Sequence, residues 1–356
     1  FSEGVGLYST NGKEGLRRLG NRSELETRYR GHLTLPSLAV FATDLGQSGT
    51  WDEISEHAGL LHVAVANGVK IYSWTPGSNS WSSLLRTLPA TATDSLHFTL
   101  GGTEYVAFAH TGGYSYSSNG SAYTEDTTSN ALLLTFWDDR LWGIDNTGQL
   151  WFSVTIGTEV PDAKLALPDG YVNRLFVGPD ASGEDIIYAA TEVGLYAHDA
   201  ANSRFVKTKV QYPQNTDAGK AACTWNGEIY IGIGRTSVIR YDPVGGQAML
   251  IGLDEGGAGN LLLSIESVNA AFTKFLPTSS GMVGLVYDTG GANCSIWEYS
   301  GRGWHYLHRL VGIETIHVSS AGSSYRLYRT AIQRLQYQDL HIGKINPDTE
   351  TISYDS

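Results

Sequence analysis

Residues 185–197 read Asp185-Ile186-Ile187-Tyr188-Ala189-Ala190-Thr191-Glu192-Val193-Gly194-Leu195-Tyr196-Ala197. This is an apolar strand, a turn that contains a glycine, and a second strand that carries an aromatic residue. The pattern occurs seven times, with the aromatic at Tyr72, Tyr116, Trp151, Tyr196, Tyr241, Trp297 and Tyr337, so that successive copies lie 35 to 56 residues apart. A period of about 40–50 residues built from short strands indicates a β-propeller, with one four-stranded blade for each repeat.

We therefore predict an all-β fold, a β-propeller of seven blades with four antiparallel strands each. Eight blades are the alternative if residues 3–45 form a blade of their own. Residues 5–9 (Val-Gly-Leu-Tyr-Ser) resemble residues 193–197, which suggests strands of a partial repeat near the N-terminus. We assign residues 1–50 to a segment whose strands close the ring, because closure removes exposed sheet edges. Residues 51–356 hold the propeller repeats, and we expect the chain to be a module of a longer protein.

The composition narrows the range of partners. The 356 residues contain 24 Lys and Arg against 36 Asp and Glu, a net charge of −12. An acidic surface repels the phosphate backbone, so we expect no nucleic-acid partner. No stretch approaches the roughly 18 apolar residues of a membrane span, so we expect no membrane insertion. The two cysteines, Cys223 and Cys294, are predicted to be free thiols because their spacing alone does not pair them.

Motifs of known chemistry are missing from the sequence. The turn at residues 117–123 resembles the Ser-x-Asp-x-Gly-x-Thr-Trp turn of sialidases only loosely, and that family's Arg-Ile-Pro segment is absent. The Trp-Asp pairs do not follow a Gly-His as in WD40 repeats, and the paired glycines fall at unequal places for kelch repeats. Asp138 and Asp139 are adjacent turn carboxylates, which usually face solvent. We therefore predict that the chain is not an enzyme and has no catalytic residues.

A metal or cofactor is not predicted either. Residues 180–185 and 288–293 carry oxygen ligands of the kind that Ca²⁺ prefers, but neither follows a known calcium-loop pattern. We interpret both as solvated turns.

Position within the repeat suggests a binding rim. In a propeller the turns between second and third strands gather around one end of the central channel, where binding residues are commonly placed on loops. Here those turns carry a ring of polar and charged side chains. They are Asn67 together with the residues that we predict to bind a partner, His110, Asp145, Glu192, Arg235 and Asp288.

The repeats resemble the β-propeller segments of large structural proteins of tailed bacteriophages. The resemblance is carried by residues 185–196 and 282–299 and by the end of the chain at residues 352–356, where such proteins often continue into a β-sandwich. It implies a virion component of the tail or baseplate that binds or scaffolds without catalysis. Its partners would be other virion proteins or a glycan or protein of the host surface.

An alternative function is that of a secreted lectin or carbohydrate-active enzyme. The nine tryptophans, which can stack on sugar rings, and the acidic rim favour it. A carboxylate pair at glycosidase separation in the channel mouth would indicate the enzyme. Tryptophans exposed at the rim would indicate the lectin, and tryptophans buried between blades would favour a scaffold.

Overall fold

The computed structural model describes most of the chain beyond residue 39. The described residues are 40–165, 171–253, 270–279, 281–288, 293–301, 303–311, 313–321, 324–331, 334–340, 344–345 and 352–353. Within them the regular elements are β-strands, and neighbouring strands of each sheet pair antiparallel with one exception. This part of the chain contains no helix with the length and hydrophobicity needed to cross a bilayer.

The described strands fall into groups of four, which we call blades. The first three are β2–β5 (Glu53–His57, Leu60–Val65, Lys70–Thr75, Ser80–Trp81), β7–β10 (Ala92–Leu100, Thr103–His110, Gly113–Ser117, Thr124–Asp126) and β11–β14 (Leu133–Trp137, Arg140–Ile144, Gln149–Ser153, Glu159–Lys164). A short strand β6 (Arg86–Thr87) also pairs with β4.

The next three blades follow the same order. They are β15–β18 (Val172–Pro179, Asp185–Thr191, Gly194–Asp199, Arg204–Gln211), β19–β22 (Ala222–Trp225, Glu228–Gly232, Val238–Asp242, Gln247–Leu250) and β23–β26 (Ala270–Pro277, Met282–Asp288, Asn293–Tyr299, Trp304–Val311). The β11–β14 and β15–β18 blades are joined into one sheet by the parallel pair of Lys164 with Arg204.

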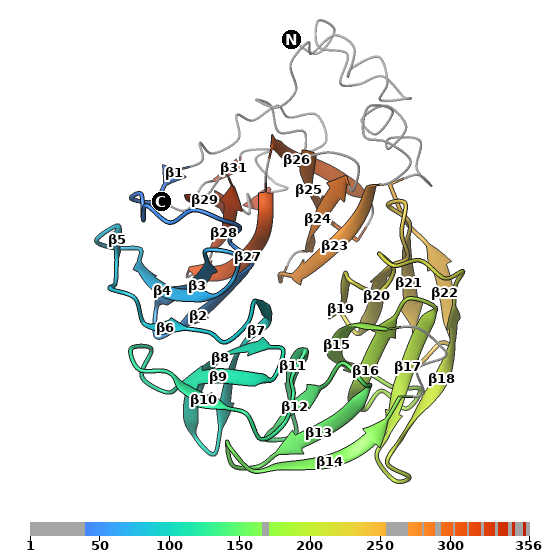
Figure 1. The fold of residues 1–356 in the computed structure, drawn as a ribbon. Coiled ribbons are helices and arrows are strands. Elements are labelled where there is room, and N and C mark those ends of the chain that lie inside the picture. The colour runs from blue at the N-terminus through green and yellow to red at the C-terminus, as the bar shows by residue number, and fades with distance from the viewer. Residues whose placement is uncertain are drawn as a thin grey trace, which may run out of the picture.

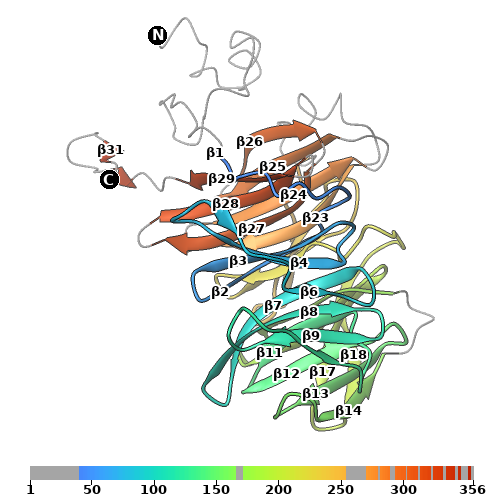
Figure 2. The same cartoon turned by 60° about the vertical axis from the view of Figure 1, so that its left-hand side comes forward.

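The last described blade combines strands from distant parts of the chain. Strands β27 (Ile313–Ala321), β28 (Ser324–Ala331) and β29 (Arg334–Leu340) pair in order, and β1 (Val40–Phe41) pairs with β29 as the outermost strand. Figure 2 shows β1 beside β29 at this edge. A separate two-stranded sheet is formed by β30 (Lys344–Ile345) and β31 (Ile352–Ser353).

The blades are arranged as a ring around one axis (Figure 1). The innermost strand of each blade contacts that of the next in the order β2, β7, β11, β15, β19, β23 and β27, and β27 contacts β2 again. The predicted β-propeller is therefore confirmed, and the described blades close a ring of seven. Residues 3–20 and the rest of the first 39 residues lie outside the described residues, so the blade number of the whole chain and the boundary at residue 50 stay predictions.

The aromatic residues that revealed the repeat all lie on the third strand of their blades, namely β4, β9, β13, β17, β21, β25 and β29. Neighbouring blades bury them against one another. Tyr114 of one blade stacks on Trp151 of the next with ring centroids 5.7 Å apart, and Trp74 contacts Tyr328 and Tyr337 across the closing seam. Both faces of each sheet are thus covered, which explains why the second strands read as nearly continuous apolar runs.

The aromatic residues that open the fourth strands also connect blades, as expected from the sequence. The hydroxyl of Tyr123 lies 2.8 Å from Nδ1 of His62 in the preceding blade. The indole nitrogen of Trp304 donates a hydrogen bond of 2.6 Å to the carbonyl of Ile251, also in the preceding blade. Cys223 and Cys294 are buried and form no disulfide, as predicted.

Substituting Gly143 tests this packing between side chain and strand. The indole ring of Trp151 lies directly over Gly143 in the β12–β13 pair, so that a Cβ at residue 143 overlaps the ring. We expect Gly143→Ala to lower the free energy of unfolding by about 1–3 kcal/mol, the usual cost of overpacking. Chemical denaturation measures the change.

Gly77→Ala is the matched control, because nothing lies within 4 Å of its added Cβ. Equal stability of Gly143→Ala and the wild type would contradict the packing of Trp151 described here.

Candidate functional site

A cavity of about 650 Å³ lies on the ring axis, where the innermost strands of five blades contribute side chains. It includes the β2–β3 turn at Ala58 and Gly59, so it opens at the end of the channel where first strands turn into second strands. Polar side chains of both charge signs line it, together with three imidazoles. They are Glu56, His57, Asp94, His97, Glu104, Arg174, Lys274 and His317.

Two ion pairs cross the channel from one blade to another. Arg174 on β15 lies 3.0 Å from Asp94 on β7, measured from Nη1 to Oδ1, and Lys274 on β23 lies 3.2 Å from Glu53 on β2, measured from Nζ to Oε2. The other oxygen of Asp94 accepts a hydrogen bond of 3.0 Å from the backbone of Leu134. The cations of two blades thus neutralise the carboxylates of two others.

The pKa values of these groups reflect burial opposed by their partners. Burial raises the pKa of Glu53, while the nearby Lys274 acts in the opposite direction. The charge of Asp94 raises the pKa of Arg174, which stays protonated. Hydroxyl groups complete the network, since Ser95 donates to Glu53 over 3.1 Å and Lys274 donates to Thr315 over 3.2 Å.

His317 on β27 also lines the cavity. Its Nε2 is buried and has no hydrogen-bond partner in the described residues. Burial, with the charge of Lys274 and the His97 ring, lowers the pKa of His317 to about 3. The ring is therefore neutral at physiological pH and offers a hydrogen-bonding nitrogen to the cavity.

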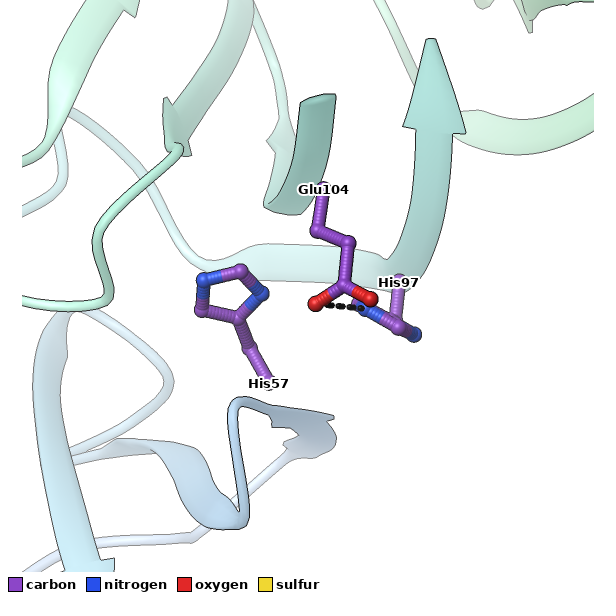
Figure 3. Close-up of side chains that lie close together, drawn as sticks. All are labelled: His57, His97 and Glu104. Atoms are coloured by element: carbon purple, nitrogen blue, oxygen red, sulfur yellow. Dashed lines mark ion pairs between the residues drawn. The ribbon is translucent and has the colours of Figure 1, made fainter. Parts of the chain in front are cut away.

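Three of the lining side chains meet at the edge of the cavity (Figure 3). They are His57 at the end of β2, His97 on β7 and Glu104 on β8. One ligand atom from each lies within 4.8 Å of those of the other two, and the Nε2 atom of His97 lies 3.9 Å from Oε2 of Glu104. His57 is buried, whereas His97 and Glu104 face solvent.

The structure places the predicted rim residues at the opposite end of the blades, and none of those whose side chains are described lines the cavity. His110 is fully buried, with Nε2 at 2.6 Å from Oε1 of Glu125. Asp145 accepts hydrogen bonds from its own turn, from the backbone of Thr147 at 2.7 Å and of Gln149 at 2.9 Å.

The remaining rim residues differ in exposure. Glu192 is nearly buried and accepts a hydrogen bond of 3.2 Å from Gln214, while Arg235 is exposed with a φ of 50°. The side chain of Asp288 lies outside the described residues. Among the others, no described hydrogen bond or ion pair joins two predicted residues, and a binding role for them stays a prediction.

The sequence did not predict the cavity residues, because they belong to no recognisable motif. One weak signal exists: a charged residue interrupts the innermost strand of several repeats, as Asp94, Arg174 and Lys274 do. Recognising it requires knowing that these strands face one another across a channel. The sequence alone places them in separate repeats.

The exposure of the tryptophans distinguishes between the lectin and the scaffold that the sequence left open. All nine lie in the described residues, and none is exposed. Trp51, Trp74, Trp142, Trp151 and Trp297 are fully buried, and the other four are partly buried. This arrangement favours a scaffold over a lectin, which needs exposed rings for stacking on sugars.

Comparison with known proteins defines the class of fold. The chain is similar to a chain in the crystal structure of the mitotic checkpoint complex, at 13% identity and a TM-score of 0.60, covering 86% of this chain and 95% of that one. It is also similar to YCF48 from Cyanidioschyzon merolae (10% identity, TM-score 0.57, 84% and 98% covered). A third match is YCF48 bound to D1 peptide (11% identity, TM-score 0.57, 87% and 97% covered).

No protein-family model matches the sequence, and no curated protein matches it. At these identities the solved structures show the fold alone, a β-propeller.

Substituting Arg174 tests the ion pairs of the channel. Arg174→Met removes the cation next to Asp94, whose side chain is only 3% exposed. We expect the free energy of unfolding to fall by about 3 kcal/mol, because a buried carboxylate then lacks its partner. Urea denaturation at neutral pH measures the loss.

Arg204→Met is the matched control, because Arg204 is 64% exposed in its pair with Asp199. Its loss is expected to stay below about 1 kcal/mol. Equal losses in the two variants would show that the Arg174–Asp94 pair has no special structural role.

Proposed function

We propose that this chain is a non-catalytic binding propeller that docks a polypeptide segment of a partner protein at the channel mouth. The observation that carries the proposal is the cavity of about 650 Å³ on the ring axis. A cavity of this size accommodates a small ligand or a few side chains of a peptide. The match to YCF48 bound to D1 peptide supports a peptide ligand for this kind of fold.

The chemistry of the wall supports binding rather than catalysis. The two innermost carboxylates, Glu53 and Asp94, are paired with Lys274 and Arg174, whereas general acid–base catalysis needs carboxyl groups free to exchange protons. Glu56, by contrast, lines the cavity at its mouth and is partly exposed. The carboxylates of Glu56 and Glu104 at the mouth, on a chain of net charge −12, favour a basic segment of the partner.

Charge reversal at Glu56 tests the proposal. An array of random peptides is screened with the purified chain, and binders are measured again with Glu56→Lys. We expect basic peptides to bind the wild type and to bind Glu56→Lys at least tenfold more weakly, because the cavity mouth then repels them.

Glu184→Lys is the matched control, since Glu184 lies in an exposed turn away from the cavity and keeps wild-type binding. The proposal fails if no peptide binds, or if both variants lose binding equally.

For the partners we propose proteins of a bacteriophage tail or baseplate, with the chain located in the virion. This assignment rests on the style of the repeats, residues 185–196 and 282–299 above all. The scaffold-like burial of the tryptophans is compatible with it.

Electron microscopy of the native assembly tests the location. We expect the ring in a tail or baseplate, with a neighbouring subunit or a host receptor over the end of the channel that Ala58 and Gly59 border. Isolation of the chain as a free secreted monomer would contradict the virion assignment and would leave the peptide proposal standing.

A further inference from the structure

The β7–β8 hairpin holds His97 and Glu104 on one face of the β7–β10 blade. Thr99 pairs with Glu104 across the hairpin, and His97 is two residues from Thr99 on the same strand. Because side chains alternate between faces, His97 and Glu104 point the same way as diagonal neighbours. The tight turn at Gly101 and Gly102, both with positive φ, fixes this register.

His57 reaches the same place from the neighbouring blade. His57 is 3% exposed, and among the described residues its buried Nδ1 has no hydrogen-bond partner. Figure 3 shows that Nδ1, the ring nitrogen bonded to Cγ, faces the carboxylate of Glu104. A buried imidazole nitrogen without a partner is costly, so this position favours a bound ligand.

The surroundings of His57 hold the ring in this orientation. Gly120 leaves room for it, because a Cβ there would lie 3.2 Å from Cδ2 of His57.

Two other histidines of the chain lie closer to a carboxylate than His97 does. His110 contacts Glu125 and His198 contacts Asp162, each with 2.6 Å between nitrogen and oxygen. The His97–Glu104 separation of 3.9 Å is too long for a hydrogen bond. The atoms therefore surround a gap instead of satisfying one another.

The size of that gap suits a small cation. Metal–ligand distances of about 2.0–2.2 Å place two ligand atoms of a tetrahedral ion roughly 3.4 Å apart. The three atoms here lie within 4.8 Å of one another. The side chains of His97 and Glu104 are 42% and 58% exposed, so they are free to close the remaining distance by rotation.

We propose that His57, His97 and Glu104 form a binding site for a divalent transition metal ion such as Zn²⁺ at the edge of the channel mouth. Two imidazoles and one carboxylate suit Zn²⁺ and neighbouring transition metals better than Ca²⁺ or Mg²⁺, which prefer oxygen ligands. Three protein ligands leave a coordination position open toward the cavity, where water or a partner side chain completes the shell.

The site also couples two blades, because β2 supplies one ligand while β7 and β8 supply the others. The metal site does not depend on the proposed peptide ligand, because it is argued from the geometry of His57, His97 and Glu104 alone.

Calorimetric titration of the untagged, chelator-treated chain with ZnCl₂ tests the site. We expect one Zn²⁺ per chain with a dissociation constant in the micromolar range or below. Glu104→Gln and His97→Gln remove exposed ligands with little risk to folding, and each is expected to weaken binding at least tenfold. His57→Gln is expected to do the same, provided that circular dichroism shows a folded chain.

His317→Gln and Glu184→Gln are the matched controls, because His317 lines the same cavity outside the cluster and Glu184 is exposed elsewhere. Both are expected to bind Zn²⁺ like the wild type. The proposal is overturned by absence of binding up to 1 mM ZnCl₂, by binding that persists in both Glu104→Gln and His97→Gln, or by equal weakening in the controls.

Discussion

Each four-stranded blade of this chain has two apolar faces, and neither is covered within its own repeat. Coverage comes from the blades on both sides, as the stacking of Tyr114 on Trp151 illustrates. A single repeat therefore has no complete core, and stability belongs to the ring. The pairing of β1 with β29 completes the last described blade. The contact of Trp74 with Tyr328 extends the mutual coverage to the interface between this blade and the first one.

Around the axis the blades also depend on one another, here through charged side chains instead of apolar faces. The innermost strands converge there, and the side chains that face the channel cannot all be apolar without collapsing it. The chain instead places Asp94 opposite Arg174 and Glu53 opposite Lys274, so that charges from four blades neutralise one another. These pairs keep a polar cavity open and connect blades that do not touch through their main cores. The cavity mouth, with Glu56 and the histidines, is built on that support.

The fold was predictable because its information is local and repeated. Tyr196 and its six counterparts all lie on third strands, since each strand–turn–strand unit carries its own hydrophobic pattern and turn residues. The candidate site was not predictable in the same way. Lys274 and Glu53 are 221 residues apart and meet only because the ring closes.

His110 shows the other limit of the sequence reasoning. Its predicted place in a turn suggested exposure, but the ring is fully buried and contacts Glu125 on β10. The sequence identifies turns well, yet it does not say which turn residues are buried by the neighbouring strand. His57 was not predicted for a different reason, because the residues that meet it, His97 and Glu104, belong to the next repeat.

The seam between β1 and β29 has a mechanical consequence. Val40 pairs with Tyr337 and Phe41 with Gln336, so the segment before β1 and the segment after β29 leave the seam from the same end. Tension applied through these two segments loads the ladder one bond after another, as in opening a zipper, rather than all bonds at once in shear. Such a pull separates β1 from β29 first, while the contacts of β27 with β2 and of Trp74 with Tyr328 still join the last described blade to the first.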